Sequence, residues 1–241
     1  MKSHDELGDI IVDSGTKFVF PRWVNYLLPL VILAAIGGAT YVPLLAYLAG
    51  SPYTTAVGYE PVQPVPFSHK LHAGELGMDC RYCHSTVEKA AFAAVPPTQT
   101  CMNCHATIKT DSAKLALIRE SHATGLAVPW KKVHDLPDYA YFNHSIHVNK
   151  GVGCVTCHGR VDKMEVVKQV QPLSMAWCLE CHREPEKFLR PREEVTNMAW
   201  AVPMAENQTV DQAQVSLGKE LKEKYNVHDK TYMTGCYTCH R

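Results

Sequence analysis

Cys154-Val155-Thr156-Cys157-His158 decides how this sequence folds, because the same Cys-x-x-Cys-His pattern occurs four more times along the chain. The five copies, called motifs 1 to 5 in chain order, are Cys80-Arg81-Tyr82-Cys83-His84, Cys101-Met102-Asn103-Cys104-His105, Cys154-Val155-Thr156-Cys157-His158, Cys178-Leu179-Glu180-Cys181-His182 and Cys236-Tyr237-Thr238-Cys239-His240. They use all 10 cysteines of the 241 residues. Little room therefore remains for a disulfide framework or a cysteine-ligated iron–sulfur cluster.

The spacing within each motif has a mechanical explanation. Two thiols three positions apart share one helical turn, where each can form a thioether with a haem vinyl group, and the next histidine reaches the iron. Zinc ribbons also use paired cysteines, but zinc does not require a histidine after every second cysteine. The sequence predicts five covalently bound c-type haems, with the proximal iron ligands His84, His105, His158, His182 and His240.

The second axial position of each iron decides what a haem can do. A second histidine suits electron transfer, whereas an open position permits substrate chemistry. Outside the motifs, beyond His4 near the N-terminus, the available histidines are His69, His72, His122, His134, His144, His147 and His228. Two histidines three positions apart point the same way on a helical turn. The pairs His69-x-x-His72 and His144-x-x-His147 are therefore each predicted to serve two closely spaced haems.

One distal position remains after these two pairs are used. His134, upstream of the second pair, is the predicted fifth distal ligand, and His122 and His228 are expected to be solvated. Met175 and Met164 are alternatives, since a methionine ligand would raise the potential of its haem. Packing against porphyrin is the simpler role for either methionine.

The motifs also form an internal repeat. Phe67-Ser68-His69-Lys70-Leu71-His72 precedes motifs 1 and 2, and Phe142-Asn143-His144-Ser145-Ile146-His147 precedes motifs 3 and 4. This order predicts a duplicated two-haem module plus one extra haem at motif 5. So few residues per haem cannot build an ordinary core, which predicts mostly loops and short α-helices packed around haems. Short helices are expected at residues 112–120, 198–206 and 216–225.

An uncharged stretch lies between Arg22 and Glu60. It predicts a transmembrane anchor at residues 23–50, because about 20 apolar residues cross a bilayer. A cleaved signal peptide is the alternative, but its apolar region would span only about 7–15 residues. The sequence thus divides into a cytoplasmic tail at 1–22, the anchor, a proline-rich linker at 51–66 and a pentahaem domain at 67–241.

Haem is joined to thiols outside the bacterial inner membrane, so the haem domain is expected to be periplasmic or extracytoplasmic. Lys17 and Arg22 near the anchor agree with a cytoplasmic N-terminus, although nearby acidic residues weaken this signal. The chain has 24 basic and 24 acidic residues. No clustered basic excess indicates nucleic-acid binding, so the expected surroundings are membrane lipid and protein partners.

The connecting sequence resembles one family. The stretches that carry the resemblance are Phe67-Ser68-His69-x-x-His72, Val133-His134-Asp135-Leu136-Pro137-Asp138, Phe142-Asn143-His144-Ser145-x-His147, Gly153-Cys154-Val155-Thr156-Cys157-His158-Gly159-Arg160-Val161-Asp162 and Met175-Ala176-Trp177-Cys178-Leu179-x-Cys181-His182-Arg183. They resemble the pentahaem cytochrome subunit of bacterial alternative complex III, over nearly the whole chain.

The resemblance implies a place in a menaquinol:acceptor oxidoreductase. Its partners would be a membrane subunit that oxidises quinol, an iron–sulfur subunit and a monohaem cytochrome. Electrons would leave to a periplasmic acceptor, either a cytochrome c or a blue copper protein, or to a terminal oxidase. This chain would relay electrons without a catalytic site of its own.

Two other functions compete with this one. A multihaem nitrite or hydroxylamine reductase needs an open haem and commonly carries a lysine in one motif, whereas every motif here ends in histidine. A small membrane-anchored quinol dehydrogenase feeding a periplasmic reductase would usually have four haems.

Overall fold

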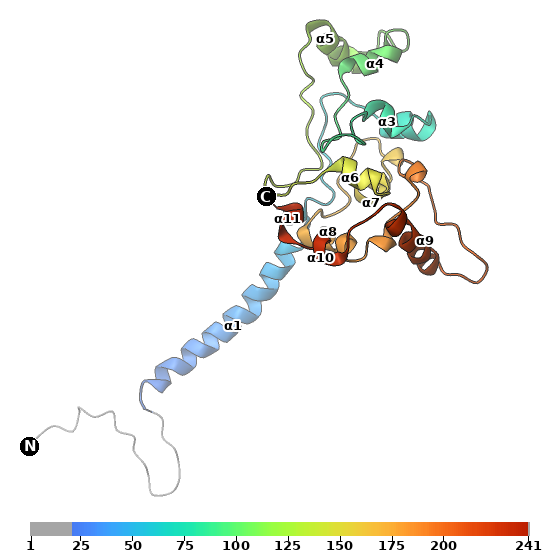
Figure 1. Ribbon diagram of the computed structural model, residues 1–241. Coiled ribbons are helices and arrows are strands. Elements are labelled where there is room, and N and C mark those ends of the chain that lie inside the picture. Colours follow the sequence, from blue (N-terminus) through green and yellow to red (C-terminus); the bar gives the residue numbers. More distant parts are fainter. Residues whose placement is uncertain (1–20, 241) are drawn as a thin grey trace, which may run out of the picture. The chain divides into compact units, whose positions relative to one another are not determined.

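The computed structural model describes residues 21–240, which form helices and loops (Figure 1). Within this range there is no named strand, and an isolated antiparallel bridge joins Val152 to Leu189. This confirms the predicted fold of loops and short helices. The elements are α1 (Val24–Ala49), α2 (Pro52–Thr55), η1 (Lys70–Glu75), α3 (Cys80–Cys83), α4 (Thr98–His105), η2 (Ala113–Leu115), α5 (Ala116–Thr124), α6 (His144–Asn149), α7 (Cys154–His158), η3 (Val161–Lys163), α8 (Met175–Arg183), η4 (Pro185–Lys187), η5 (Arg192–Glu194), α9 (Val210–Lys224), α10 (Lys230–Met233) and α11 (Cys236–Cys239).

The chain divides into two units, of which the first ends at Thr54. Its helix α1 has 26 residues and a mean hydropathy of 2.0, so it is long and apolar enough to cross a membrane. Pro29 and Pro43 lie inside the helix, as membrane helices tolerate. Most of the predicted cytoplasmic tail, including Lys17, lies outside the described residues.

The second unit begins at Thr55, earlier than the predicted domain start at Phe67. The backbone N–H of Gly58 donates to the Gln169 carbonyl at 2.7 Å, and the Gln169 side chain donates to the Thr55 carbonyl at 2.8 Å. Val65 is also buried. The proline-rich segment therefore packs on the motif-bearing unit along residues 55–66 instead of standing apart as a linker.

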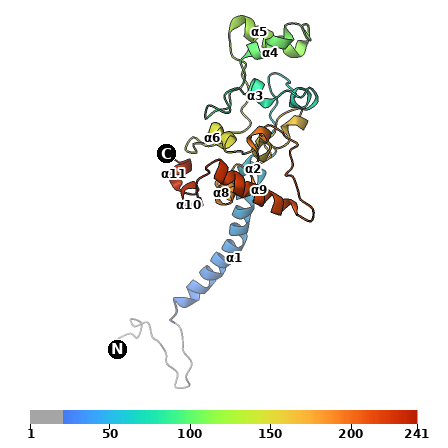
Figure 2. The same cartoon turned by 45° about the vertical axis from the view of Figure 1, so that its right-hand side comes forward.

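Buried apolar side chains in the second unit form only small clusters in the described part of the chain. Each contains three buried residues, and the clusters are Val65, Ile118 and Val128; Val87, Val148 and Val195; and Leu189, Leu221 and Tyr225. Helix pairs such as α4 with α5 and α8 with α10 lie side by side in both views (Figure 1; Figure 2). No large side-chain core holds the motifs together in residues 55–240.

Two of the three predicted short helices are present. Residues 113–120 belong to η2 and α5, and residues 216–224 belong to the longer α9, which Thr209 begins with a capping box. The helix predicted at 198–206 is wrong, because this segment is a loop. Pro203 lacks a donor N–H and disfavours helical backbone in the residue before it, which explains the loop.

Candidate functional site

Each motif occupies a short helical turn. Motifs 1 and 5 form the four-residue helices α3 and α11, motif 3 forms α7, and motifs 2 and 4 lie within α4 and α8. At α3 the Asp79 carboxylate accepts the backbone N–H of Arg81, and at α8 the Ser174 hydroxyl accepts that of Trp177. In motifs 2, 3 and 4 the histidine is still helical, so both cysteines and the histidine share one side of the helix, whereas His84 and His240 directly follow the helices of motifs 1 and 5.

The proximal histidines have oriented rings. In four of them Nδ1 donates to a backbone carbonyl, which leaves Nε2 as the basic nitrogen. The pairs are His84 with Ala94 at 2.9 Å, His105 with Ile108 at 3.0 Å, His182 with Met233 at 2.8 Å and His240 with Tyr139 at 3.0 Å. Burial lowers the pKa of His158 to about 3, and the nearby charges of His134 and His144 contribute to this shift. A neutral imidazole is the form that binds a metal.

The two His-x-x-His units have the same local structure. Phe67 stacks on His72 and Phe142 stacks on His147, each with ring centroids 4.4 Å apart. The same phenylalanines meet His69 and His144 edge-on, at 4.8 and 4.7 Å and an angle of 88° in both cases. The repeat in the sequence is therefore a repeat in space. Phe67 and Phe142 therefore hold the histidine rings, a role that their repetition in the sequence does not by itself indicate.

Histidine ring separations test whether the site fits a haem iron. An iron between two imidazoles needs ring centres about 6 Å apart, from two metal–nitrogen bonds of about 2 Å and about 1 Å from each nitrogen to its ring centre. The observed pairs are His72 with His105 at 6.2 Å, His147 with His182 at 6.2 Å and His144 with His158 at 6.4 Å. These spacings fit an iron with two histidine ligands.

His69 lies near the histidine of motif 1. Burial lowers its pKa to about 4, and the charges of His84 and then His72 add to the effect. Its Nδ1 is buried without a hydrogen-bond partner in the described chain. In each module the first histidine of the pair therefore lies near the first motif, and the second histidine lies near the second motif.

His134 lies beside motif 3. Its ring centroid is 4.4 Å from that of His158, too short for an iron between the two rings. Within residues 21–240 the ring contact of His240 is instead to Tyr139, at 5.8 Å. The edge-on contact between His134 and His158 involves the face of one ring and leaves both nitrogens of His134 unbonded to His158, so His134 stays the predicted fifth distal ligand. Its Nε2 is buried without a partner among the described residues.

The alternative methionine ligands have ordinary surroundings. Met175 begins α8 and is 67% exposed, while the Met164 carbonyl accepts the backbone N–H of Lys70 at 2.9 Å. Arg81 in motif 1 and Arg160 just after motif 3 form ion pairs with Asp79 and Asp162. Neither arginine is therefore a free cation.

Contacts between motifs place them in a spatial order. The thiols of Cys80 and Cys154 share a hydrogen bond, which lowers the pKa of Cys80 to about 7 and raises that of Cys154, so motif 1 meets motif 3. Tyr82 of motif 1 accepts a hydrogen bond from Asn103 of motif 2 at 3.4 Å. The Ala91 carbonyl, which follows motif 1, accepts from His144 Nδ1 at 2.9 Å.

The remaining neighbours extend the order at its other end. Burial raises the pKa of Cys157 to about 12, and the charges of Cys181 and Cys178 add to this effect. Because Cys157 belongs to motif 3 and the other two cysteines to motif 4, these motifs lie near one another. Burial and then Cys239 raise the pKa of Cys178. The hydrogen bond from His182 to the Met233 carbonyl, just before motif 5, agrees with this contact. The spatial order is motif 2, 1, 3, 4, 5.

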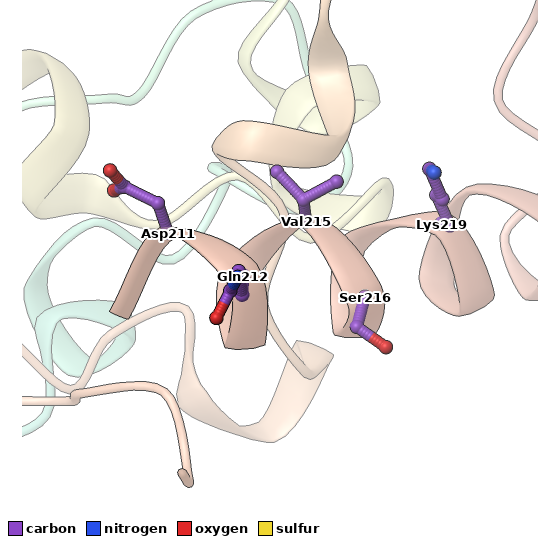
Figure 3. Close-up of a pocket in the computed structure, with 5 residues that line it drawn as sticks. All are labelled: Asp211, Gln212, Val215, Ser216 and Lys219. Atoms are coloured by element: carbon purple, nitrogen blue, oxygen red, sulfur yellow. The ribbon is translucent and has the colours of Figure 1, made fainter. Parts of the chain in front are cut away.

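Exposed apolar side chains lie near the motifs, and a surface hollow lies away from them. Phe92, Ile108 and Ile146, each close to a motif or ligand in sequence, are 77%, 56% and 55% exposed, as expected of side chains that cover an apolar group. A surface hollow of about 610 Å³ is lined by Asp211, Gln212, Val215, Ser216 and Lys219, all on α9 (Figure 3). It contains no cysteine or histidine and belongs to no haem site.

The fold and the repeated motifs define this chain as a multihaem c-type cytochrome. Residues 51–128, with motifs 1 and 2, match the class III cytochrome c family, and residues 130–234, with motifs 3 and 4, match the cytochrome c552 family. The boundary between the matches separates the two modules.

A curated relative is the menaquinone reductase multihaem cytochrome c subunit of Nitratidesulfovibrio vulgaris strain Hildenborough. It is 36% identical over 97 residues, which make up 40% of this chain and 45% of the relative. The chain is thus similar to under half of that protein.

Proposed function

We propose that this chain carries five c-type haems and relays electrons within a membrane complex of the alternative complex III type. The observation that carries the proposal is the series of neighbouring motifs. Hydrogen bonds link motif 2 to motif 1, motif 1 to motif 3, and motif 4 to Met233 just before motif 5, and cysteines of motifs 3 and 4 lie near one another. When bound, haem supplies reversible one-electron chemistry. The cysteines of each motif would hold one haem, so the haems would follow the spatial order of the motifs. The haems at the two ends of this series would belong to motifs 2 and 5.

Paired histidines would make the first four irons six-coordinate. The proposed axial pairs are His69 with His84, His72 with His105, His144 with His158 and His147 with His182. Their ring separations and buried positions support these assignments. Six-coordinate iron leaves no position for a substrate, which supports relay over a nitrite or hydroxylamine reductase.

The anchor would hold the relay at the membrane surface. Helix α1 would cross the bacterial inner membrane once, with the N-terminus in the cytoplasm and the motif-bearing unit outside. A quinol-oxidising membrane subunit, an iron–sulfur subunit and a monohaem cytochrome would be its partners. A periplasmic cytochrome c, a blue copper protein or a terminal oxidase would accept the electrons.

The name of the curated relative favours a second candidate with the opposite direction of flow. That protein is a subunit of a menaquinone reductase. By this similarity, the chain would deliver electrons toward menaquinone in a membrane complex. The contacts among the motifs are equally suited to both directions, so an assay on the assembled complex separates them.

The test is purification of the tagged full chain from its native membranes. Under the main proposal it copurifies with a large assembly whose haems are reduced by menaquinol. Reduction of menaquinone by prereduced assembly, without the reverse reaction, supports the second candidate. A lone anchored cytochrome that oxidises quinol by itself contradicts both, as does a high-spin, ligand-accessible haem at motifs 1 to 4.

A further inference from the structure

Arg190 is a buried cation beside motif 3 that the sequence does not single out. Its backbone N–H donates to the Gly151 carbonyl at 2.8 Å, next to the bridge between Val152 and Leu189. The residue is only 8% exposed. This pairing fixes the strand-like segment before Cys154 and carries the arginine side chain toward the motif.

The guanidinium lies directly against the start of motif 3. A Cβ atom added to Gly153 would come within 2.3 Å of both Cζ and Nε of Arg190. The group stacks over the Trp200 ring at 4.9 Å, and its Nη1 donates to the Asn197 carbonyl at 3.2 Å. Gly153 is therefore the residue that lets the cation approach the Cys154 attachment point.

The charge of Arg190 has no ion pair among the described residues, although the Glu194 carboxylate is close enough to act on it. Within residues 21–240 its Nε also has no hydrogen-bond partner. Burial holds the pKa of Arg190 below its usual value, yet a guanidinium stays charged in proteins. At motif 1 the residue before the first cysteine is instead Asp79, whose carboxylate pairs with Arg81 at 2.9 Å.

We infer that Arg190 raises the reduction potential of the haem at motif 3. Reduction adds an electron to that centre, and a buried cation without a salt bridge stabilises the added charge. The inference rests on the proposed attachment of a haem at Cys154 and Cys157. It makes the middle position of the series 2, 1, 3, 4, 5 more easily reduced than it would be without the arginine.

The experiment is a redox titration of the full haem-loaded chain by NMR, which follows the haem methyl signals of each centre separately. Arg190→Gln is expected to shift the equilibrium of the motif 3 haem toward the oxidised form by on the order of tenfold, or about 59 mV for one electron. Arg190→Lys keeps the charge and should restore most of the potential. Arg192→Gln removes an exposed cation that stacks on Tyr225, and is the control without an effect.

Haem counting by intact mass separates failure of this inference from failure of the proposed function. A wild-type chain lacking the motif 3 haem refutes the proposed function. An Arg190→Gln chain with all its haems and an unchanged motif 3 potential overturns the role of Arg190. If Arg190→Gln does not load haem, Gly153→Ala displaces the guanidinium instead, and an unchanged motif 3 potential in that variant also overturns the inference.

Discussion

Replacement of Gly74 by alanine should loosen the first His-x-x-His unit. Gly74 lies in η1, which also contains His72, and a Cβ atom there would be 2.2 Å from the Asp162 carbonyl oxygen and 3.3 Å from its carbon. The obstacle is backbone, so no side chain can rotate away. Restoring ordinary contact requires η1 to move by about 1 Å away from the segment that follows motif 3.

The expected cost follows from two opposing effects. Overpacking costs about 1–3 kcal/mol, whereas replacing a helical glycine by alanine returns up to about 1 kcal/mol. A net loss of about 1–2 kcal/mol lowers Tm by about 2–8 °C in a domain of this size. The shift of η1 also moves His72 relative to His105, so part of the low-spin signal at motif 2 should become high-spin.

The assay combines thermal unfolding of the haem-loaded chain, followed by circular dichroism, with EPR of its oxidised haems. Gly37→Ala is the matched control, because the added Cβ meets nothing within 4 Å. A Gly74→Ala variant with an unchanged or higher Tm and an intact low-spin spectrum would refute the proposed packing of η1 against Asp162.

Further predictions concern the axial ligands and their support. Asn143→Ala removes the side chain that caps α6 and should cost about 1 kcal/mol in unfolding experiments, while Asn143→Asp should cost less. His147→Ala should convert the motif 4 haem to a high-spin form visible by EPR, whereas His134→Ala should leave the motif 3 haem low-spin. A low-spin motif 4 haem in the first variant, or a high-spin motif 3 haem in the second, would contradict these assignments. Acidification should lower folding stability, because the pKa of His69 is about 4 in the folded chain and 6.5 in the unfolded chain, so the unfolded chain binds more protons between about pH 6.5 and 4. A free energy of unfolding that stays constant over that interval contradicts this. Gly218→Ala should destabilise the contact of α9 with η4, because its Cβ would lie close to the Glu186 carbonyl, and an unchanged unfolding midpoint would count against that contact.

Local chemistry explains what the sequence could predict. A thioether motif requires its cysteines and histidine on one turn, and all five motifs lie on such turns. The repeated Phe67 and Phe142 hold the histidine pairs in the same geometry, so the duplication is visible in both sequence and structure. A long uncharged stretch likewise predicts α1 from composition alone.

Contacts between distant segments explain what the sequence could not predict. Gln169 binds the segment around Thr55 across more than 100 residues, which makes a proline-rich linker part of the compact unit. His134 has the residue type of a ligand, but its position beside His158 depends on how the residues between them fold back, which spacing does not reveal. Arg190 resembles any surface arginine until its contact with Gly153 is known.

The most direct test of the central claim is intact mass spectrometry of the full chain, purified from a host that assembles c-type cytochromes and denatured before measurement. Covalent attachment survives denaturation, so each occupied motif adds one haem to the polypeptide mass. We expect the mass of the chain plus five haems, and four haems after replacement of Cys236 and Cys239 by alanine. A wild-type chain with four haems or fewer, at full loading of the host's own cytochromes, would contradict the five-haem relay.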